Sequence, residues 1–518
     1  MKEMHRSLCW AGYLLSIIIV PISAPAQTTS EVRDKVHQYR ESHEKEILKQ
    51  FSELLAIPNL ASDAPNIRKN AEVIAAKLEQ RGVHARLLEL SDSPPVVYGE
   101  LPVPGAKHTL IIYAHYDGQP VDAAQWSSPP WNPVLRDKPF DQGGSEVDLN
   151  SFPQAYSEYR IYARSAGDDK APIQAVLTAL DSLKATGLAP TINLKFFFEG
   201  EEEAGSSHLP QIIREHAEML RADAWLLCDG PVHQTRQMQV YFGARGVTDL
   251  ELTVYGPLRP LHSGHYGNWA PNPAALVSEL LTSMRDHDAH IKIPGFYQDV
   301  RPLTDSERLA IRQMPEVDTA MKNELGLSWT EGEPEPLPLR IMKPALNVRG
   351  IEAGHVGPKT QNAVPNEARA SIDFRLVPDQ KPEKVHALVE EHIRTQGFFI
   401  VHQTPTMKER RTHRWLVNLE WGTGYPAART SMDLPVSRAV VRSIEGALGT
   451  AIIKAPMLGG SVPMYLFTDF LKTPVIGVPI ANHDDNQHAA DENLRIQNLW
   501  DGIDVFAGLM TGVEREWK

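Results

Sequence analysis

Short apolar runs alternate with stretches of helical spacing along much of this chain. The apolar runs lie at 109–113, 192–198, 224–227 and 474–480, and a helical stretch at 172–185 lies between two of them. Runs that are apolar throughout are typical of strands buried on both faces of a parallel sheet that helices cover. The pattern therefore predicts an α/β fold whose main domain contains a mostly parallel sheet.

The middle of the chain has a different pattern. Residues 248–254 and 370–377 alternate apolar and polar positions, as half-exposed strands do, and amphipathic helical stretches lie at 272–287 and 382–395. Residues 294–344 are proline-rich and irregular. We expect a smaller α+β domain inserted into the α/β domain. The predicted limits are 1–26 for a signal peptide, 27–240 and 416–518 for the two parts of the α/β domain, and 241–415 for the inserted domain.

The N-terminus has the pattern of an export signal. Lys2 and Arg6 precede an apolar stretch at 8–22, which is too short to span a bilayer comfortably, and Ala24 and Ala26 form a small-x-small cleavage pattern. The alternative interpretation is an uncleaved membrane anchor. We expect the signal to be cleaved and the protein to be secreted or periplasmic.

Cysteine usage and charge restrict the environment and the partners. Cys9 lies in the signal, so the mature chain would keep Cys228 alone, which excludes an internal disulfide and fits a bacterial periplasm as well as the outside. The formal net charge of −13 disfavours binding to nucleic acid or to an anionic membrane. We therefore expect no nucleic-acid partner, and no membrane association after signal cleavage.

Five groups of acidic and histidine residues follow apolar runs or precede a helix. They are His115 with Asp117, Asp168 with Asp169, the acidic string at 199–203, Asp229, and His488. Ligand sites in open α/β sheets lie at the carboxyl ends of the strands, where such residues would gather. The placement therefore predicts a functional site at this edge of the sheet.

Taken singly, each group has a structural interpretation as a turn, a helix cap or a solvated face. Together they favour a metal site, because Glu201, Glu202 and Glu203 come shortly after the phenylalanine run at 196–198 and would repel one another without a cation. Histidine and carboxylate donors without thiolates suit zinc, manganese or cobalt. The chain lacks the GxSxG motif of a serine hydrolase, and Ile47 replaces the second histidine of a His43-Glu44 HExxH motif.

Eight strings of the sequence resemble, in the same order, the dinuclear zinc metallopeptidases that include carnosinase, aminoacylase, the glutamate carboxypeptidases and succinyl-diaminopimelate desuccinylase. The resemblance covers nearly all of the mature chain, and IPGFY at 293–297 resembles the carnosinase-like dipeptidase branch. The strings are HYDGQP at 115–120, DDK at 168–170, FEGEEEAGS at 198–206, LLCDG at 226–230, LHSGHYGNWAPNP at 261–273, IDFRLVP at 372–378, GGSVP at 459–463 and HxxxE at 488–492.

The resemblance implies two divalent metal ions per chain, with zinc as the expected metal and manganese or cobalt as alternatives. His115 and Asp229 would bind one ion, Glu203 and His488 the other, and Asp168 would bridge both. It also implies that Glu202 is the general base and that Asp117 orients His115.

The resemblance further implies a hydrolase that cleaves a peptide bond next to a free C-terminal carboxylate, as a dipeptidase or carboxypeptidase. The implied substrate-binding residues are Arg375, Asn362, Gly459, Gly460 and Ser461. The inserted domain would serve as a lid and dimerisation domain. In the homodimer, His262 would reach the partner's site and donate a hydrogen bond to the oxyanion.

Two departures from the family pattern affect the expected substrate. The glycine-rich approach GRGxxDDKG is ARSAGDDKA at 163–171, which indicates a loop of different shape. The carnosinase-type REGGS is MLGGS at 457–461, so two charged residues are absent and carnosine-like dipeptides are disfavoured. An N-acyl-amino-acid deacylase with the same machinery and a non-catalytic binding protein on this fold remain the alternatives.

Overall fold

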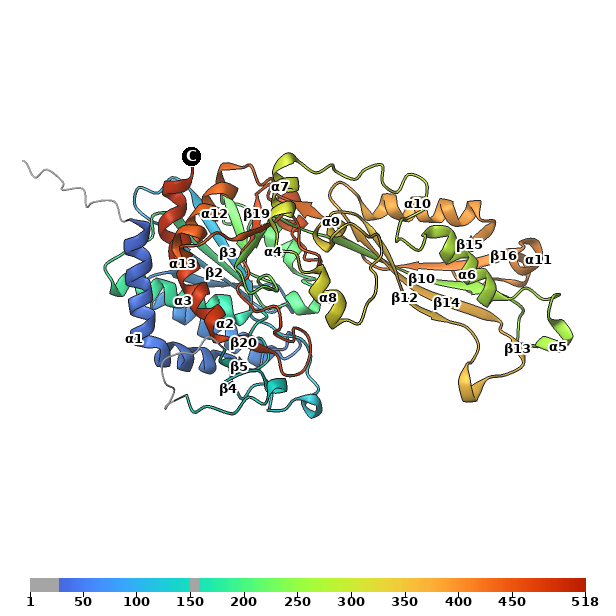
Figure 1. The fold of residues 1–518 in the computed structure, drawn as a ribbon, viewed down its shortest axis with the longest axis horizontal. Helices are drawn as coiled ribbons and strands as arrows, with labels where there is room; N and C mark the ends of the chain where they lie inside the picture. The colour runs from blue at the N-terminus through green and yellow to red at the C-terminus, as the bar shows by residue number, and fades with distance from the viewer. Residues whose placement is uncertain (1–27, 150–157) are drawn as a thin grey trace, which may run out of the picture.

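The computed structural model describes residues 28–149 and 158–518. The signal peptide predicted at 1–26 lies outside the described residues. Figure 1 shows two lobes, a larger one that contains both ends of the described chain and a narrower one that projects from it. Within the described ranges, no helix has both the length and the apolar character needed to cross a membrane.

An eight-stranded sheet forms the centre of the larger lobe. Its strands follow the order β1-β2-β6-β3-β7-β19-β8-β18. Their bounds are β1 His84–Leu88, β2 Val96–Leu101, β6 Asn193–Glu199, β3 Thr109–His115, β7 Ala224–Leu227, β19 Val475–Gly477, β8 Gln239–Tyr241 and β18 Ile453–Ala455.

The four central strands of this sheet, β6, β3, β7 and β19, are parallel, as the apolar runs predict. The sheet as a whole is mixed, because β1 pairs with β2, β2 with β6, and β19 with β8 in antiparallel fashion. The loops that join β1 to β2 and β2 to β3 are short. Parallel neighbours would need a long crossover connection, so these short loops favour the antiparallel direction of β2. The predicted α/β fold class is confirmed, with antiparallel pairs added outside its parallel centre.

Helices and loops bury both faces of the central strands. On one face, Leu110 and Ile112 of β3 belong to a core shared with α1, α2, α3, α12 and α13, and on the other face Ile111 and Tyr113 pack with residues of α4 and of a π-helical turn. The bounds are α1 Thr29–Leu55, α2 Ala64–Glu79, α3 Lys170–Ala185, α12 Pro435–Leu448, α13 Ile496–Glu516, α4 Leu209–Glu215 and the π-turn Leu466–Phe470. A three-stranded sheet of β4 Val134–Arg136, β5 Arg160–Tyr162 and β20 Asn493–Arg495 lies beside them.

The narrower lobe contains a five-stranded sheet in the order β12-β14-β10-β16-β15. Its pairs are antiparallel except β15 with β16. Residues of β10 alternate between buried and more exposed positions, and α6 and α10 pack against the apolar face. The bounds are β10 Gly246–Tyr255, β12 Ala345–Glu352, β14 Glu367–Leu376, β15 Phe398–Val401, β16 Trp415–Trp421, α6 Pro273–Met284 and α10 Pro382–Thr395. This sheet confirms the smaller α+β domain within the α/β fold, while the exact domain limits stay a prediction.

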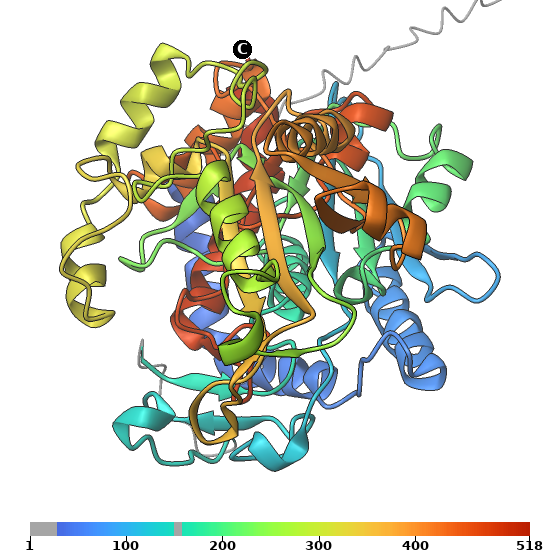
Figure 2. The ribbon, with the colours of Figure 1, turned by 90° about the vertical axis from the view of Figure 1, so that its right-hand side faces the viewer.

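The proline-rich segment at 294–344 contacts the larger lobe before the chain enters β12. Its first helix, α7 (Asp305–Gln313), packs against β18, and Glu307 forms an ion pair of 3.0 Å with Arg429. Two further helices follow, α8 (Asp318–Glu324) and α9 (Leu337–Ile341). Figure 2, which looks onto the end of the narrower lobe, shows this yellow segment to one side of the second sheet.

Candidate metal centre

The parallel strands bring the predicted ligands to one edge of the larger sheet. His115 is the last residue of β3, Glu203 follows β6 in a short 3-10 helix (Glu202–Ala204), and Asp229 follows β7. Asp168 lies just before α3, and His488 lies in the loop after β19. Because β6, β3 and β7 are adjacent and parallel, their carboxyl ends meet at this edge.

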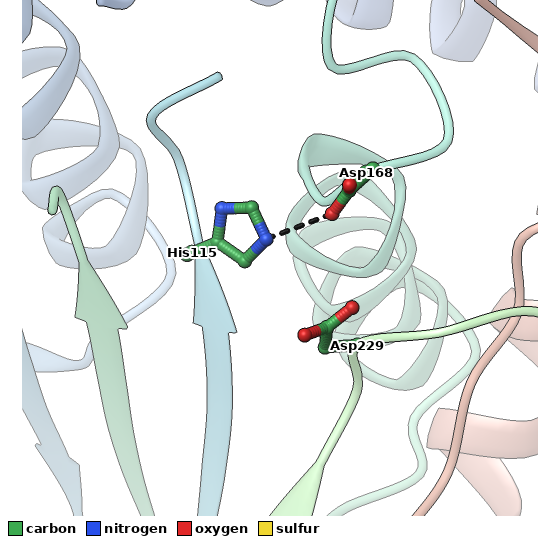
Figure 3. Close-up of side chains that lie close together, drawn as sticks. All are labelled: His115, Asp168 and Asp229. Carbon is green, nitrogen blue, oxygen red and sulfur yellow. Dashed lines mark hydrogen bonds and ion pairs between the residues drawn. The ribbon is translucent and has the colours of Figure 1, made fainter. Parts of the chain in front are cut away.

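Two ligand groups share Asp168. His115, Asp168 and Asp229 form one group, Asp168, Glu203 and His488 form the other, and the donor atoms within each group lie within 4.8 Å of one another. Oδ1 of Asp168 is 2.8 Å from His115 Nε2, and its Oδ2 is 3.1 Å from His488 Nε2. Figure 3 shows the side chains of the first group pointing toward a common centre. The carboxylate of Asp168 therefore presents one oxygen to each group.

The electrostatics of the cluster suit a cation. Burial and the charge of Asp168 raise the pKa of Glu203 to about 8 and that of Asp229 to about 6. Burial also raises the pKa of Asp168, but hydrogen bonds with His115 and His488 outweigh it and hold that pKa below its usual range. Carboxylates crowded in this way are stabilised in their charged form by a nearby positive charge. The donor set of imidazoles and carboxylates, without thiolates, fits zinc, manganese or cobalt.

Asp117 connects the first ligand to the loop that carries the acidic string. Its Oδ1 lies 3.3 Å from His115 Nδ1, and its two carboxylate oxygens accept hydrogen bonds from the backbone N–H groups of Glu202 (3.1 Å) and Glu203 (3.0 Å). Asp117 is fully buried. Such a carboxylate fixes both the orientation of the imidazole and the position of the neighbouring loop.

Glu492 holds the loop that carries Asp168, a role that we did not predict from the sequence. This buried carboxylate accepts hydrogen bonds of 3.0 Å from the backbone N–H groups of Ser165, Gly167 and Asp168, and of 2.7 Å from Arg164 Nη1. The available sequence signal was its place in the HxxxE string. The HxxxE string gives only the spacing of Glu492 from His488. The hydrogen bonds of Glu492 reach a loop more than 300 residues away in the sequence, which the string does not reveal.

The departure from the glycine-rich pattern at 163–171 has a structural explanation. Ser165 has a φ of 63°, in the left-handed region that favours glycine. Its hydroxyl accepts a hydrogen bond of 2.7 Å from Asn59 Nδ2 and donates one of 3.3 Å to the carbonyl of Asp117. The serine thus adds side-chain contacts in a conformation that a glycine would also adopt.

Arg375 contacts one of the other predicted substrate-binding residues. Its Nη1 donates a hydrogen bond of 2.8 Å to Ser461 Oγ, and its Nε lies 2.8 Å from Asp373 Oδ2. Gly459 and Gly460 precede Ser461 in the same loop. The side chain of Arg375 is about one-third exposed (34%), so solvent and a small ligand can reach it.

His262 and Asn362 lie far from the ligand groups of their own chain. His262 is in β11 (Leu261–His262), which pairs with β13 (Ala363–Val364), and the N–H of Ser263 donates to the carbonyl of Asn362 at 2.9 Å. Both residues are exposed. In Figure 1, β13 and the adjoining α5 (Ser263–Tyr266) lie at the outer end of the narrower lobe. Within one chain, the structure therefore does not bring these two predicted site residues to the ligand cluster.

A mixed α/β fold with histidine and carboxylate groups gathered at the carboxyl ends of its strands is the arrangement of a metal-dependent enzyme. The family model described as Peptidase family M20/M25/M40 matches residues 111–512. The chain belongs to this family and is a metallopeptidase, which confirms the resemblance seen in the sequence and excludes a non-catalytic binding protein.

Several relatives are similar over nearly their whole length. The chain is 26% identical to the Cys-Gly metallodipeptidase dug1 of Schizosaccharomyces pombe, covering 91% of this chain and 96% of that protein. It is 25% identical to the Beta-Ala-His dipeptidase of Homo sapiens, covering 96% of each. Among solved structures, the M20 family metallo-carboxypeptidase Sso-CP2 of Sulfolobus solfataricus is 28% identical, with a TM-score of 0.71 and coverage of 91% and 99%.

The relatives also correct the expected location. The yeast Cys-Gly metallodipeptidases, which align with 91% and 92% of this chain, are cytosolic enzymes. The prediction of a secreted or periplasmic protein is therefore wrong. It rested on composition at 1–26, where a short apolar segment after two basic residues is a pattern that does not require export.

Proposed function

We propose that this chain is a dipeptidase that uses two divalent metal ions to hydrolyse the peptide bond next to a free C-terminal carboxylate. The observation that carries the proposal is the pair of ligand groups that share Asp168. The names of the relatives, Cys-Gly and Beta-Ala-His dipeptidases, support dipeptides as the substrate class. N-acyl-amino-acid deacylation would use the same residues, so a panel of dipeptides and N-acyl amino acids on the metal-loaded enzyme decides between the two activities.

In this proposal His115, Asp168 and Asp229 hold one ion, and Asp168, Glu203 and His488 hold the other, with zinc as the expected metal. When bound, such a pair supplies Lewis-acid chemistry that acidifies a water molecule and polarises the scissile carbonyl. Glu202 belongs to neither ligand group. Its side chain is therefore available to take a proton from the attacking water and to return it to the leaving nitrogen.

We expect about two metal ions per chain, removable by a chelator with loss of activity and restored by Zn²⁺, Mn²⁺ or Co²⁺. Because Asp168 joins both groups, Asp168→Asn should reduce the metal content at both positions. Asp34→Asn, at a side chain that is 73% exposed in α1, is the matched control and should keep the full metal content. Elemental analysis of active protein that finds no transition metal would contradict the proposal.

Arg375 is the proposed contact for the C-terminal carboxylate, because a guanidinium binds a carboxylate through two parallel hydrogen bonds. We assign supporting roles to Ser461, Gly459 and Gly460 in the neighbouring loop. Asn362 would act from the partner chain, since it lies beside His262.

Replacing Arg375 with Lys should lower kcat/KM for a free dipeptide by roughly 10- to 100-fold, because the ammonium cannot reproduce the paired hydrogen bonds. The amidated form of the same dipeptide should be a poor substrate for the wild type, and this substitution should change its turnover little. Steady-state kinetics on the two substrates measures both effects. Equal hydrolysis of free and amidated dipeptides by the wild type would rule out this role for Arg375.

We further propose a homodimer in which the domain at 241–415 forms the lid and the dimer contact. In the sequence this domain separates the two parts of the catalytic domain, at 27–240 and 416–518. The observation that supports it is the exposure of His262, whose strand β11 pairs with β13 at the outer end of the narrower lobe. A two-fold pairing would let each chain's His262 reach the other chain's metal centre.

A further inference from the structure

Tyr425 is an aromatic residue near the proposed carboxylate site for which the proposed mechanism has no role. It lies in the loop between β16 and β17 (Ala428–Arg429), and its backbone exchanges two hydrogen bonds with Val247, of 2.9 and 3.1 Å. A Cβ at the adjacent Gly246 would lie 2.4 Å from the carbonyl of Tyr425, so this close approach requires glycine. The loop is thus held firmly against the start of β10.

The strand register places Tyr425 and Arg375 on either side of Val247. Val247 pairs with Arg375 of β14 on one side and forms an antiparallel bridge with Tyr425 on the other. Residues paired directly across antiparallel strands point to the same face, at about 4.5–5.5 Å per step between Cα atoms. The two long side chains therefore rise from the same face, roughly 10 Å apart at their Cα atoms, and can reach a common point above Val247.

Ser461 approaches the same point from a third segment. Its hydroxyl accepts from Arg375 and lies 3.4 Å from the carbonyl of Gly246. The ring of Tyr425 is stacked on Tyr465, with centroids 5.7 Å apart and planes at 14°. This stacking restrains the direction of the phenol, while no hydrogen-bond partner of its hydroxyl is found among the described residues.

The pKa of Tyr425 responds to charges of both the metal centre and the proposed carboxylate site. Burial raises the pKa of the phenol to about 12, the negative charges of Glu202 and Asp229 add to the increase, and the positive charge of Arg375 opposes it. The hydroxyl consequently stays protonated at neutral pH and is a hydrogen-bond donor. A donor without a protein partner, beside an arginine, suits an anionic acceptor.

We propose that Tyr425 donates a hydrogen bond to the C-terminal carboxylate of the substrate and, together with Arg375, holds that group. This inference rests on the proposed function, and it adds a substrate-binding residue that comes from the same chain as the metal ligands. The enzyme would then recognise the free carboxylate of a substrate through two groups, the neutral hydroxyl of Tyr425 and the cationic guanidinium of Arg375.

The test compares Tyr425→Phe with Tyr465→Phe. Both substitutions keep the stacked rings and remove one hydroxyl. Burial raises the pKa of Tyr465, and the charge of Asp469, in the π-turn, adds to the increase. For a free dipeptide, Tyr425→Phe should raise KM about 10- to 100-fold with kcat nearly unchanged, the size expected for a hydrogen bond to a charged group. For the amidated dipeptide its effect should fall within about twofold, and Tyr465→Phe should behave as wild type on both substrates.

Three results would overturn the inference. Unchanged KM for the free dipeptide in Tyr425→Phe would show that the hydroxyl does not bind the carboxylate. An equal loss on free and amidated substrates, or a fall in kcat alone, would place the phenol at the reacting carbonyl instead. If the wild type itself does not discriminate between the two substrates, the carboxylate requirement of the proposed function fails and this inference fails with it, whereas the first two results leave that requirement standing.

Discussion

Replacing Glu202 with Gln is expected to lower kcat by roughly 10²–10⁴-fold while both metal ions stay bound. The carboxamide is nearly isosteric with the carboxylate but cannot take a proton. Burial raises the pKa of Glu202, with the charges of Asp229 and Asp168 adding to the shift, so that its proton affinity in the absence of metal is already high for a carboxylate. The measurement is kcat together with the metal content of the same sample.

Glu203→Gln is the control for Glu202→Gln. The two residues are adjacent, and both backbone N–H groups donate to Asp117, but only Glu203 belongs to a ligand group with Asp168 and His488. We expect Glu203→Gln to weaken metal binding first and to recover activity in excess metal. Near-normal turnover in Glu202→Gln would show that another residue is the base.

His262→Ala is expected to reduce kcat by about 10²–10³-fold, the usual effect of removing one donor to an oxyanion. In a single chain this histidine is exposed and contacts His265, with ring centroids 4.5 Å apart, rather than any metal ligand. Such a loss is therefore expected only if the imidazole acts in the site of a partner subunit. His287→Ala, at a side chain of the same lobe that is 87% exposed, should keep normal activity.

Complementation separates a shared site from an indirect effect of His262. Inactive His262→Ala chains and inactive Glu202→Gln chains are mixed and allowed to exchange. A mixed dimer would contain one site with both defects and one site with neither, so each mixed dimer should recover about half of wild-type activity. A mixture that stays inactive after exchange, or an active enzyme that sediments as a monomer, would show that the sites are not shared.

The site could be predicted from sequence as far as local placement allows. Each ligand follows an apolar run or precedes a helix, and the carboxyl ends of parallel strands lie together in any such sheet. The roles of Glu492 and Tyr425 could not be found in this way. Glu492 acts on backbone groups more than 300 residues away, and Tyr425 reaches the site only because its loop pairs with Val247.

The fold class, the presence of a smaller α+β domain and the donor types of the predicted site follow from sequence patterns, because periodicity and residue type reflect which faces are buried and which donors are present. Three other features become visible only in the folded chain. Asp168 presents one oxygen to each ligand group, and α7 of the proline-rich segment packs back against β18. The strand that carries His262 pairs with β13, which lies at the outer end of the narrower lobe. These features depend on strand order and on contacts between distant segments, and a local pattern of apolar and polar residues carries no information about either.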